Sequence, residues 1–414
     1  MSYINRKSDE IEISLPGSKS ITARCLIAAS LAHGISKIHN PAVCKDIQLL
    51  ETALKSLEID IKRQNNYFEV TGCEGALPAK EGNLFVENAG TAMRFLTALC
   101  TLGHGRFTID GSDRMRKRPI GALTEALNKL GTSVSDNSSF PPVCIESKGL
   151  TGGAAVVNCK ESSQFLSALL LVAPYAKKDV VLSIHKSVST PYIKMTIEIM
   201  KIFGINVEYS DKNNFTVKTG KYIGGELHVE PDASSASYLF AAAAILPRKV
   251  SVLNLSASSL QGDIKFIEIL SQMGTSVKAE KDKVTVAGTG NLKGINVDMR
   301  DTPDIVPALA AVAAFADSPT TIRGIGHLRL KESDRIKSIA EGLAQLGGKT
   351  DEGKDWIKIY PSVLSCGKIR SYNDHRIAMA FSVIGLKVSG VIIDNCECVE
   401  KSFPDFFSFC SKLS

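Results

Sequence analysis

The hydrophobic positions of this chain gather in apolar stretches that each open with small polar residues. The first runs from Ser18 and reads SKSITARCLIAASLA, and the second starts at Gly90 with GTAMRFLTALC. Similar stretches begin at Ser162, Ser234, Pro303 and Asn373. Successive starts are therefore separated by 72, 72, 72, 69 and 70 residues. Because apolar residues surround each predicted helix on nearly all sides, the pattern predicts buried helices, one in each copy of an internal repeat.

A second kind of helix alternates with these buried helices. In KRPIGALTEALNKLG, which runs from Lys117, apolar residues recur every three or four positions, as is typical of a helix with one buried stripe. Similar stretches begin at Lys45, Thr190, Gln261 and Glu332. A glycine follows the last apolar residue in most of them, as expected of a C-terminal cap. These glycines are Gly131, Gly204, Gly274 and Gly347.

Short segments of alternating apolar and polar residues follow the amphipathic helices. Residues 205–220 (INVEYSDKNNFTVKTG) and 275–290 (TSVKAEKDKVTVAGTG) each predict two strands joined by a polar turn. Each repeat therefore comprises a buried helix, a strand, an amphipathic helix and a hairpin. This alternation predicts an α/β fold in which the buried helices form the core and the sheets lie outside them.

The repeats divide naturally into two domains of three, residues 15–228 and residues 229–414. The sixth repeat ends at FPDFFSFCSKL (403–413) without a hairpin. The strand-like IEISL at 11–15 is predicted to complete it, so residues 1–14 are assigned to the second domain. The chain then crosses between the domains near Leu15 and near Val229.

Composition and charge narrow the class of protein. The chain is 44% hydrophobic and 22% charged, with a net charge of +6, which fits small anionic ligands better than nucleic acid. Ten cysteines without CxxC pairs indicate reduced thiols in a cytoplasm and no zinc site. No apolar run reaches a membrane-spanning length, and the opening MSYINRKSDE is unlike an export signal. These features predict a cytoplasmic protein that is not embedded in a membrane.

Cations stand at or near several helix starts, where the helix dipole disfavours positive charge. The first stretch carries Lys19 and Arg24, and later stretches carry Arg118, Arg376 and Lys401. If the helix starts of each domain share one end, and the two ends face each other across a cleft, these cations predict a site for phosphate or carboxylate groups. A purely structural alternative stays open. Good N-cap residues and a favourable first-turn acid would explain Ser18, Ser162, Ser234, Asp301 and Glu332.

A set of motifs along the chain resembles one enzyme family. The motifs are PGSKSITARCLIAASLAHG, NAGTAMR, KRPIGAL, SSQFLSALL, STPYIKMT, DASSASY, QGDI, KESDRI, YNDHRIAMAF and KSFPDF. Together they resemble the 3-phosphoshikimate 1-carboxyvinyltransferases, or EPSP synthases, over essentially the whole chain. The resemblance implies two inside-out α/β barrel domains, each of three βαβαββ-type units, with the active site in the cleft between them.

The resemblance also implies a reaction without a cofactor. In this family the enolpyruvyl group of phosphoenolpyruvate is transferred to the 5-hydroxyl of shikimate 3-phosphate, and phosphate leaves by addition and elimination. The step belongs to the shikimate pathway, which leads to chorismate and the aromatic amino acids. The implied partners are these two small molecules, with no nucleic acid or membrane, and the implied state is a monomer.

Matching motifs carry the family's site residues onto this chain. Asp304 is implied as the base, Glu332 as the general acid, and Lys19 as a contact to both substrates. The implied contacts to shikimate 3-phosphate are Lys19, Ser20, Arg24, Ser162, Ser163, Gln164, Ser189, Asp304 and Lys331. The implied contacts to phosphoenolpyruvate are Lys19, Gly90, Arg118, Gln164, Arg335, Arg376 and Lys401. No metal ligand is implied.

Three positions depart from the family pattern, and two other functions compete. Glu87 replaces a glycine, Phe95 replaces a common proline, and His327 stands where some members have asparagine near the shikimate site. The related UDP-N-acetylglucosamine enolpyruvyl transferases carry a reactive cysteine in the loop that corresponds to residues 111–120, and this chain has none there. A phosphate-binding or RNA-end-processing protein built from similar repeats is the other alternative, although only 6% of the residues are aromatic.

Overall fold

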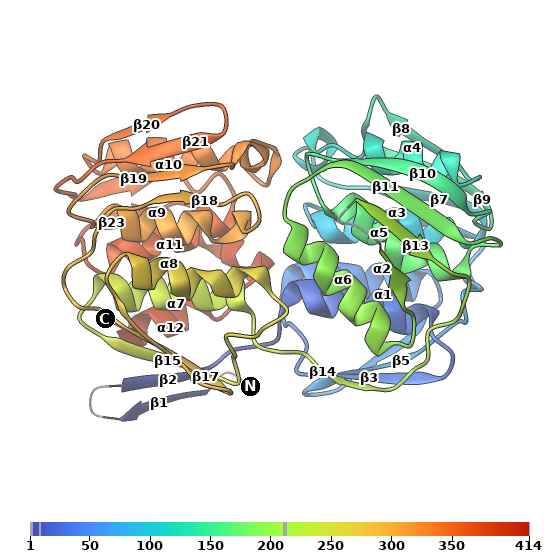
Figure 1. Ribbon diagram of the computed structural model, residues 1–414, viewed down its shortest axis with the longest axis horizontal. Helices are drawn as coiled ribbons and strands as arrows, with labels where there is room; N and C mark the ends of the chain where they lie inside the picture. The colour runs from blue at the N-terminus through green and yellow to red at the C-terminus, as the bar shows by residue number, and fades with distance from the viewer. Residues whose placement is uncertain (1–2, 8–9, 210–212, 414) are drawn as a thin grey trace. The chain divides into compact units, whose positions relative to one another are not determined.

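The computed structural model describes residues 3–7, 10–209 and 213–413 (Figure 1). The chain forms two compact units: Lys19–Val229, here called the first lobe, and Met1–Ser18 with Glu230–Ser414, here called the second lobe. Residues 15–18 thus group with the second lobe and Val229 with the first, which differs from the predicted boundaries. Within the second lobe the amide of Ser18 donates to the carbonyl of Glu230 at 2.8 Å, so the two separate segments are joined there.

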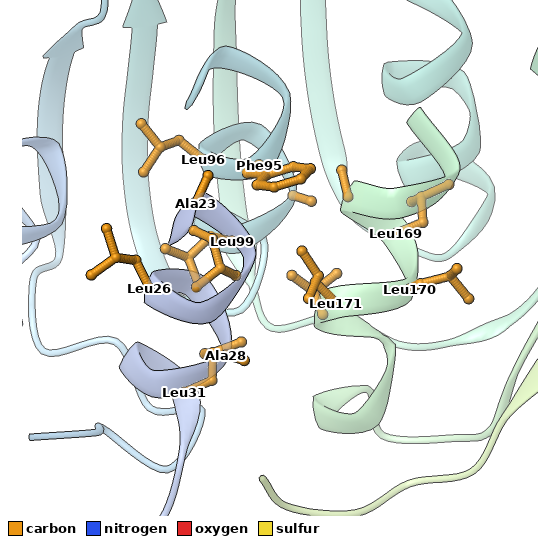
Figure 2. Packing of buried hydrophobic residues seen from close by; sticks show 14 of the residues in the cluster. Ala23, Leu26, Ala28, Leu31, Phe95, Leu96, Leu99, Leu169, Leu170 and Leu171 are labelled. Carbon is orange, nitrogen blue, oxygen red and sulfur yellow. The ribbon is translucent and has the colours of Figure 1, made fainter. Parts of the chain in front are cut away.

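The apolar stretches form the inner helices of both lobes, as predicted. In the first lobe these are α1 (Lys19–Leu31), α3 (Gly90–Cys100) and α5 (Gln164–Val172). Figure 2 shows apolar side chains of these three helices, among them Leu26, Leu99 and Leu171, all of which are buried. In the second lobe α7 (Ala233–Ile245), α9 (Val306–Ala313) and α11 (His375–Gly385) pack on one another in the same way. Helices with apolar residues on all sides are stable only where other elements cover them.

The outer helices confirm the amphipathic pattern, but several begin later than predicted. They are α2 (Lys45–Ser56), α4 (Gly121–Lys129), α6 (Thr190–Ile202), α8 (Phe266–Gln272), α10 (Arg335–Gln345) and α12 (Phe406–Leu413). Before α4, Pro119 keeps Arg118 extended, with φ −101° and ψ 127°. The predicted capping glycines are confirmed, since Gly131, Gly204, Gly274 and Gly347 all have positive φ.

Six short 3₁₀ turns occur in the described chain. They are η1 (Met115–Lys117), η2 (Ala173–Tyr175), η3 (Gly262–Lys265), η4 (Pro303–Ile305), η5 (Gly326–Leu330) and η6 (Cys396–Lys401). Segments expected to open the helices around 117, 261, 303 and 332 are therefore turns or loops. Several predicted site residues lie on these segments rather than on helices.

Each lobe is covered by three sheets. The first lobe has the strand orders β14-β3-β5-β4, β6-β7-β9-β8 and β10-β11-β13-β12. Its strands are β3 (Ile35–His39), β4 (Asp60–Arg63), β5 (Tyr67–Thr71), β6 (Glu81–Phe85), β7 (His104–Asp110), β8 (Ser133–Asn137), β9 (Phe140–Lys148), β10 (Gly153–Cys159), β11 (Val180–Ser187), β12 (Val207–Glu208), β13 (Asn214–Val217) and β14 (Glu226–His228). The hairpin predicted at 205–220 is confirmed as β12 and β13, and its residues 210–212 lie outside the described residues.

The second lobe has the strand orders β1-β2-β15-β17-β16, β18-β19-β21-β20 and β22-β23. Its strands are β1 (Tyr3–Lys7), β2 (Glu10–Ser14), β15 (Lys249–Leu253), β16 (Ser276–Ala279), β17 (Lys283–Ala287), β18 (Asn296–Asp298), β19 (Thr320–Arg323), β20 (Thr350–Glu352), β21 (Trp356–Ile359), β22 (Gly367–Ile369) and β23 (Val391–Ile393). The hairpin predicted at 275–290 is confirmed as β16 and β17.

The pairing of β2 corrects one prediction. This strand does not pair with the sixth repeat, whose sheet in the described chain is β22 and β23. Instead it lies parallel to β15 of the fourth repeat, with Ile11 opposite Val250 and Ile13 opposite Val252. Ile11 and Ile13 are buried in the core of the second lobe, and this burial fixes which sheet the strand joins. In the first lobe β14 pairs with β3 in the same parallel manner.

Two global features follow from the described chain. None of its helices combines the length and the apolar character needed to cross a membrane. Its ten cysteines are all free thiols, and of these Cys144 and Cys366 are exposed.

Candidate active site

Arg335 is the centre of a buried charge cluster in the second lobe. It is the first residue of α10, its side chain is 1% exposed, and its guanidinium binds three carboxylates. Nε donates to Asp374 Oδ2 at 2.9 Å, Nη1 to Asp304 Oδ1 at 3.2 Å, and Nη2 to Glu332 Oε2 at 2.8 Å. Burial alone would lower the pKa of Arg335, but the carboxylates of Asp374, Glu332 and Asp304 raise it above its ordinary value.

Asp304 bridges two guanidinium groups of this cluster. It lies on η4, and its second oxygen accepts from Arg376 Nη2 at 2.9 Å. Burial opposes ionisation of Asp304, but Arg376, Lys331 and Arg335 outweigh it and hold the pKa below its ordinary value. Asp304 is therefore a carboxylate at neutral pH.

Asp374 anchors the cluster from the start of α11. Its side chain is fully buried and caps α11 by accepting from the amide of Arg376 at 3.0 Å. Its Oδ2 accepts from Ser333 Oγ and from Arg335 Nε, each at 2.9 Å. One carboxylate thus fixes the start of α11, the loop before α10 and the guanidinium of Arg335.

Glu332 lies between Arg335 and Lys401. Its Oε1 is 4.0 Å from Lys401 Nζ, at the end of η6, and its side chain is 9% exposed. The interpretation of Glu332 as a first-turn acid of a helix is wrong, because α10 begins at Arg335 and Asp334 is its N-cap. Asp334 accepts from the amide of Lys337 at 3.1 Å, so the cap needs nothing from Glu332.

The capping explanation fails at other positions as well. Asp232, and not Ser234, caps α7 by accepting from the amide of Ser235 at 2.7 Å. The hydroxyl of Ser234 instead donates to Asp263. Asp301 lies before Thr302, which flanks η4. Among the predicted caps, Ser162 does accept from a helix-start amide, that of Gln164, at 3.2 Å.

Two buried residues near the cluster were not assigned roles by the sequence. Asp263 on η3 is 2% exposed, and burial together with the charge of Asp304 raises its pKa to about 7, although Arg376 opposes this. His327 on η5 is 6% exposed, and burial lowers its pKa to about 3, so it is neutral. The sequence signal for Asp263 was its place in the QGDI motif.

In the first lobe, Arg24 is buried among neutral partners. Nε donates to Thr196 Oγ1 at 2.8 Å, Nη1 to the carbonyl of Ser20 at 2.8 Å, and Nη2 to Ser167 Oγ at 3.3 Å. Burial lowers the pKa of Arg24 to about 10. The ring of Phe95 lies 5.3 Å from the guanidinium carbon, so the residue that departs from the family pattern packs directly on Arg24.

Gly90 and Arg118 meet at the start of α3. Arg118 is 6% exposed, and its Nη1 donates to the carbonyl of Asn88 at 3.1 Å and to its side-chain oxygen at 3.2 Å. A Cβ atom at position 90 would lie 2.5 Å from Arg118 Nη2, so only glycine leaves room for the guanidinium. Glu87 nearby has φ 45°, a left-handed conformation that favours glycine, and its side chain pairs with Lys45 at 3.1 Å.

Lys19 and the predicted serine residues lie at other helix starts of the same lobe. Lys19 Nζ is 3.0 Å from Asp46 Oδ2 in the first turn of α2. Gln164 opens α5 and its Nε2 donates to Thr91 Oγ1 of α3 at 3.1 Å. Ser163 and Ser189 are buried, and Ser189 is the N-cap residue of α6 with φ 57°.

The structure thus brings most predicted residues into local groups. In the second lobe one network of ion pairs contains Asp304, Glu332, Arg335, Arg376 and Lys401. The charge of Lys331 lowers the pKa of Asp304. In the first lobe Ser20 contacts Arg24, and Gly90 contacts Arg118. The described residues contain no group of three or more His, Cys, Asp or Glu side chains placed to hold a metal ion.

Comparison with known proteins gives a consistent match over the whole chain. The family model described as EPSP synthase (3-phosphoshikimate 1-carboxyvinyltransferase) matches residues 6–409. A 3-phosphoshikimate 1-carboxyvinyltransferase from Nostoc punctiforme is 42% identical over 411 residues, which cover 98% of this chain and 96% of the relative. One from Methanosphaerula palustris is 44% identical over 406 residues, covering 96% of each chain.

Solved structures agree with this match. EPSP synthase from Acinetobacter baumannii superposes with a TM-score of 0.83 at 26% identity, covering 100% of this chain and 98% of that one. The enolpyruvyl transferase NikO from Streptomyces tendae shares the fold alone, with a TM-score of 0.78 at 16% identity and coverage of 97% and 94%. The expected fold class of two inside-out α/β barrels is thereby confirmed.

Proposed function

The chain belongs to the EPSP synthase family, and from this premise we propose that Asp304, Glu332 and Lys19 carry its carboxyvinyl transfer. The acceptor is the 5-hydroxyl of shikimate 3-phosphate, the donor is phosphoenolpyruvate, and inorganic phosphate is released. The observation that carries the proposal is the Arg335 cluster, in which Asp304 and Glu332 bind different nitrogen atoms of one buried guanidinium.

The addition step needs a base and an acid. Asp304, held ionised by Arg376, Lys331 and Arg335, accepts the proton of the attacking hydroxyl. The hydroxyl oxygen forms a bond to C2 of phosphoenolpyruvate while Glu332, in its protonated form, donates a proton to the methylene carbon. The product is a tetrahedral intermediate that still carries the phosphate group.

The elimination step reverses the proton flow at carbon. The bond from C2 to the phosphate oxygen breaks, and the Glu332 carboxylate removes a proton from the methyl group, so the double bond forms again. Phosphate leaves with the electron pair of the broken bond and takes up the proton that Asp304 accepted in the addition step, so both carboxyl groups return to their starting state. Arg335, Arg376 and Lys401 balance the negative charge of the donor's carboxylate and phosphate groups throughout.

Substrate binding also explains how Glu332 acquires its proton. Glu332 accepts from Arg335 Nη2 at 2.8 Å, and its Oε1 lies 4.0 Å from Lys401 Nζ. We expect the anionic donor to compete for these two cations. Once the cations serve the donor, the ionised form of Glu332 loses stabilisation and a proton binds more readily.

Residues in the first lobe supply the remaining contacts in this proposal. Shikimate 3-phosphate is held by Lys19, Ser20, Arg24, Ser162, Ser163, Gln164 and Ser189 of this lobe, and also by Lys331, which belongs to the second lobe. Lys19 and Gln164 contact the donor as well. Gly90 and Arg118 hold the donor. Hydroxyl groups and a guanidinium are the groups that phosphate oxygens prefer.

Two measurements test the proposal. Purified protein should release phosphate from phosphoenolpyruvate only when shikimate 3-phosphate is present, and release with UDP-N-acetylglucosamine instead would assign it to the related transferases. Glu332→Gln should lower kcat by roughly 10²–10⁴-fold while shikimate 3-phosphate still binds in calorimetry. The matched control is Glu352→Gln, which removes a carboxylate of β20 in the same lobe and outside the cluster. Near-normal turnover of Glu332→Gln would exclude its role as the acid.

A further inference from the structure

Lys19 and Asp46 form an ion pair between the starts of two helices. Lys19 is the first residue of α1 and Asp46 lies in the first turn of α2. The distance from Nζ to Oδ2 is 3.0 Å, and the two side chains are only 16% and 9% exposed. With so little water around them, the attraction between these charges is stronger than in an exposed surface pair.

The two helix starts act on this pair in opposite ways. The positive end of the α1 dipole disfavours the ammonium of Lys19, whereas the positive end of the α2 dipole favours the carboxylate of Asp46. The segment that leads into α2 is tied to α1, because the amide of Ala42 donates to Thr22 Oγ1 at 2.9 Å. Asp46 is therefore fixed by its own helix and can serve as the anchor for a flexible lysine.

We propose that Asp46 is a positioning residue for Lys19, holding the ammonium group charged and in one place before the substrates arrive. The inference rests on the proposed function, in which Lys19 contacts both substrates. A lysine side chain loses rotamer entropy when it is held in one position, and a partner that orders it beforehand removes that cost from substrate binding. Asp46 acts through Lys19 and is not itself assigned a contact with substrate.

The same helix offers a matched control. Glu51 of α2 is 8% exposed, and its Oε1 lies 2.7 Å from Lys55 Nζ one turn later. Lys55 belongs to α2 itself and is 46% exposed. Glu51 Oε2 also lies 3.9 Å from Arg63 Nη1 of β4, so neither of these ion pairs reaches α1. Removing either carboxylate takes one nearly buried negative charge from α2, but only the Asp46 change acts on Lys19.

The experiment compares Asp46→Asn with Glu51→Gln in steady-state phosphate release. Asp46→Asn should lower kcat/KM about 10–100-fold, whereas Glu51→Gln should stay within about twofold of the parent protein. Asp46→Glu, which keeps the charge, should have a kcat/KM at least tenfold above that of Asp46→Asn. In a Lys19→Met background, Asp46→Asn should cause no further loss, because the group that it positions is gone.

The outcomes separate this inference from the proposed function. If Asp46→Asn keeps kcat/KM within twofold, or if its loss adds fully to that of Lys19→Met, the positioning role is wrong. If Lys19→Met itself keeps normal turnover, the role of Lys19 in the proposed function is wrong. Should Asp46→Asn not fold, Asp46→Glu and the Lys19→Met double variant still decide, since a folded Asp46→Glu with activity no better than Lys19→Met contradicts the inference.

Discussion

Arg24 in the first lobe and Arg335 in the second are equally buried, yet their surroundings are opposite. Each is 1% exposed and lies near the start of a helix. The partners that the described chain provides for Arg24 are neutral oxygen atoms, and burial lowers its pKa to about 10. Arg335 binds three carboxylates, which raise its pKa.

The contrast between Arg24 and Arg335 shows how one repeated architecture can form two kinds of site. A buried guanidinium among hydroxyl and carbonyl groups keeps a positive charge that nothing nearby cancels. We expect such a site to attract an anion from outside. A guanidinium among carboxylates is largely neutralised before any ligand binds, and it also sets the protonation state of those carboxylates. The first environment suits phosphate binding and the second suits proton transfer.

The largest expected effect comes from removing each arginine in turn. Arg335→Met leaves the carboxylates of Asp304, Glu332 and Asp374 without their shared cation, and should lower the free energy of unfolding by about 3–5 kcal/mol at pH 8. Arg24→Met should cost about 1–2 kcal/mol. The hydroxyls it leaves keep other partners, since Thr196 Oγ1 donates to Ser167 Oγ at 2.9 Å. Urea denaturation of the two variants measures both. Equal losses would contradict the comparison.

The next largest effect is expected at Asp263, which is one of the buried carboxylates of the second lobe. Its pKa is about 7 in the folded protein, because burial and Asp304 favour the protonated form. The folded state then binds more protons than the unfolded chain between the ordinary carboxyl pKa and about 7. Stability due to Asp263 is therefore present at low pH and lost as the pH rises through that window.

Asp263→Asn should remove this dependence, because the amide does not ionise. We expect the variant to be more stable than the parent by about 1–3 kcal/mol at pH 8 and about equally stable near pH 4. Ser234 can still donate its hydroxyl hydrogen to the amide oxygen of the new side chain. Urea midpoints measured across this pH range provide the test. A variant that is less stable at pH 8 than the parent would show that Asp263 is ionised and paired in the folded protein.

The smallest effect concerns Arg118, another buried arginine of the first lobe. Gly90→Ala places a Cβ 2.5 Å from Arg118 Nη2, so the guanidinium must move from Asn88. We expect KM for phosphoenolpyruvate to rise about 10–30-fold with little change in overall stability. In an Arg118→Ala background the added methyl group should have little further effect. An unchanged KM for Gly90→Ala would mean that Arg118 does not contact the donor.

Much of this protein is determined by local sequence pattern. The inner helices, the glycine caps such as Gly131 and the hairpin at 275–290 were predictable, because each depends on residues within one turn or one hairpin of each other. The motif resemblance also identified the family, since whole segments carry it. The exact helix starts were less predictable, because proline and 3₁₀ turns compete there with helix formation. Glu332 therefore lies before α10 and not within it.

The pairing of the buried charges can be read only from the tertiary structure. Arg335 pairs with Asp304 and Asp374, which lie 31 and 39 residues away, and Arg24 bonds to Thr196 at a separation of 172 residues. The repeated helix starts offer many equivalent partners, so spacing alone does not choose among them. The same is true of β2, which joins β15 because Ile11 and Ile13 are buried there. Local periodicity determines where helices and strands form. Packing within each lobe determines which polar groups are buried together, since each buried charge must find a partner within a few ångströms.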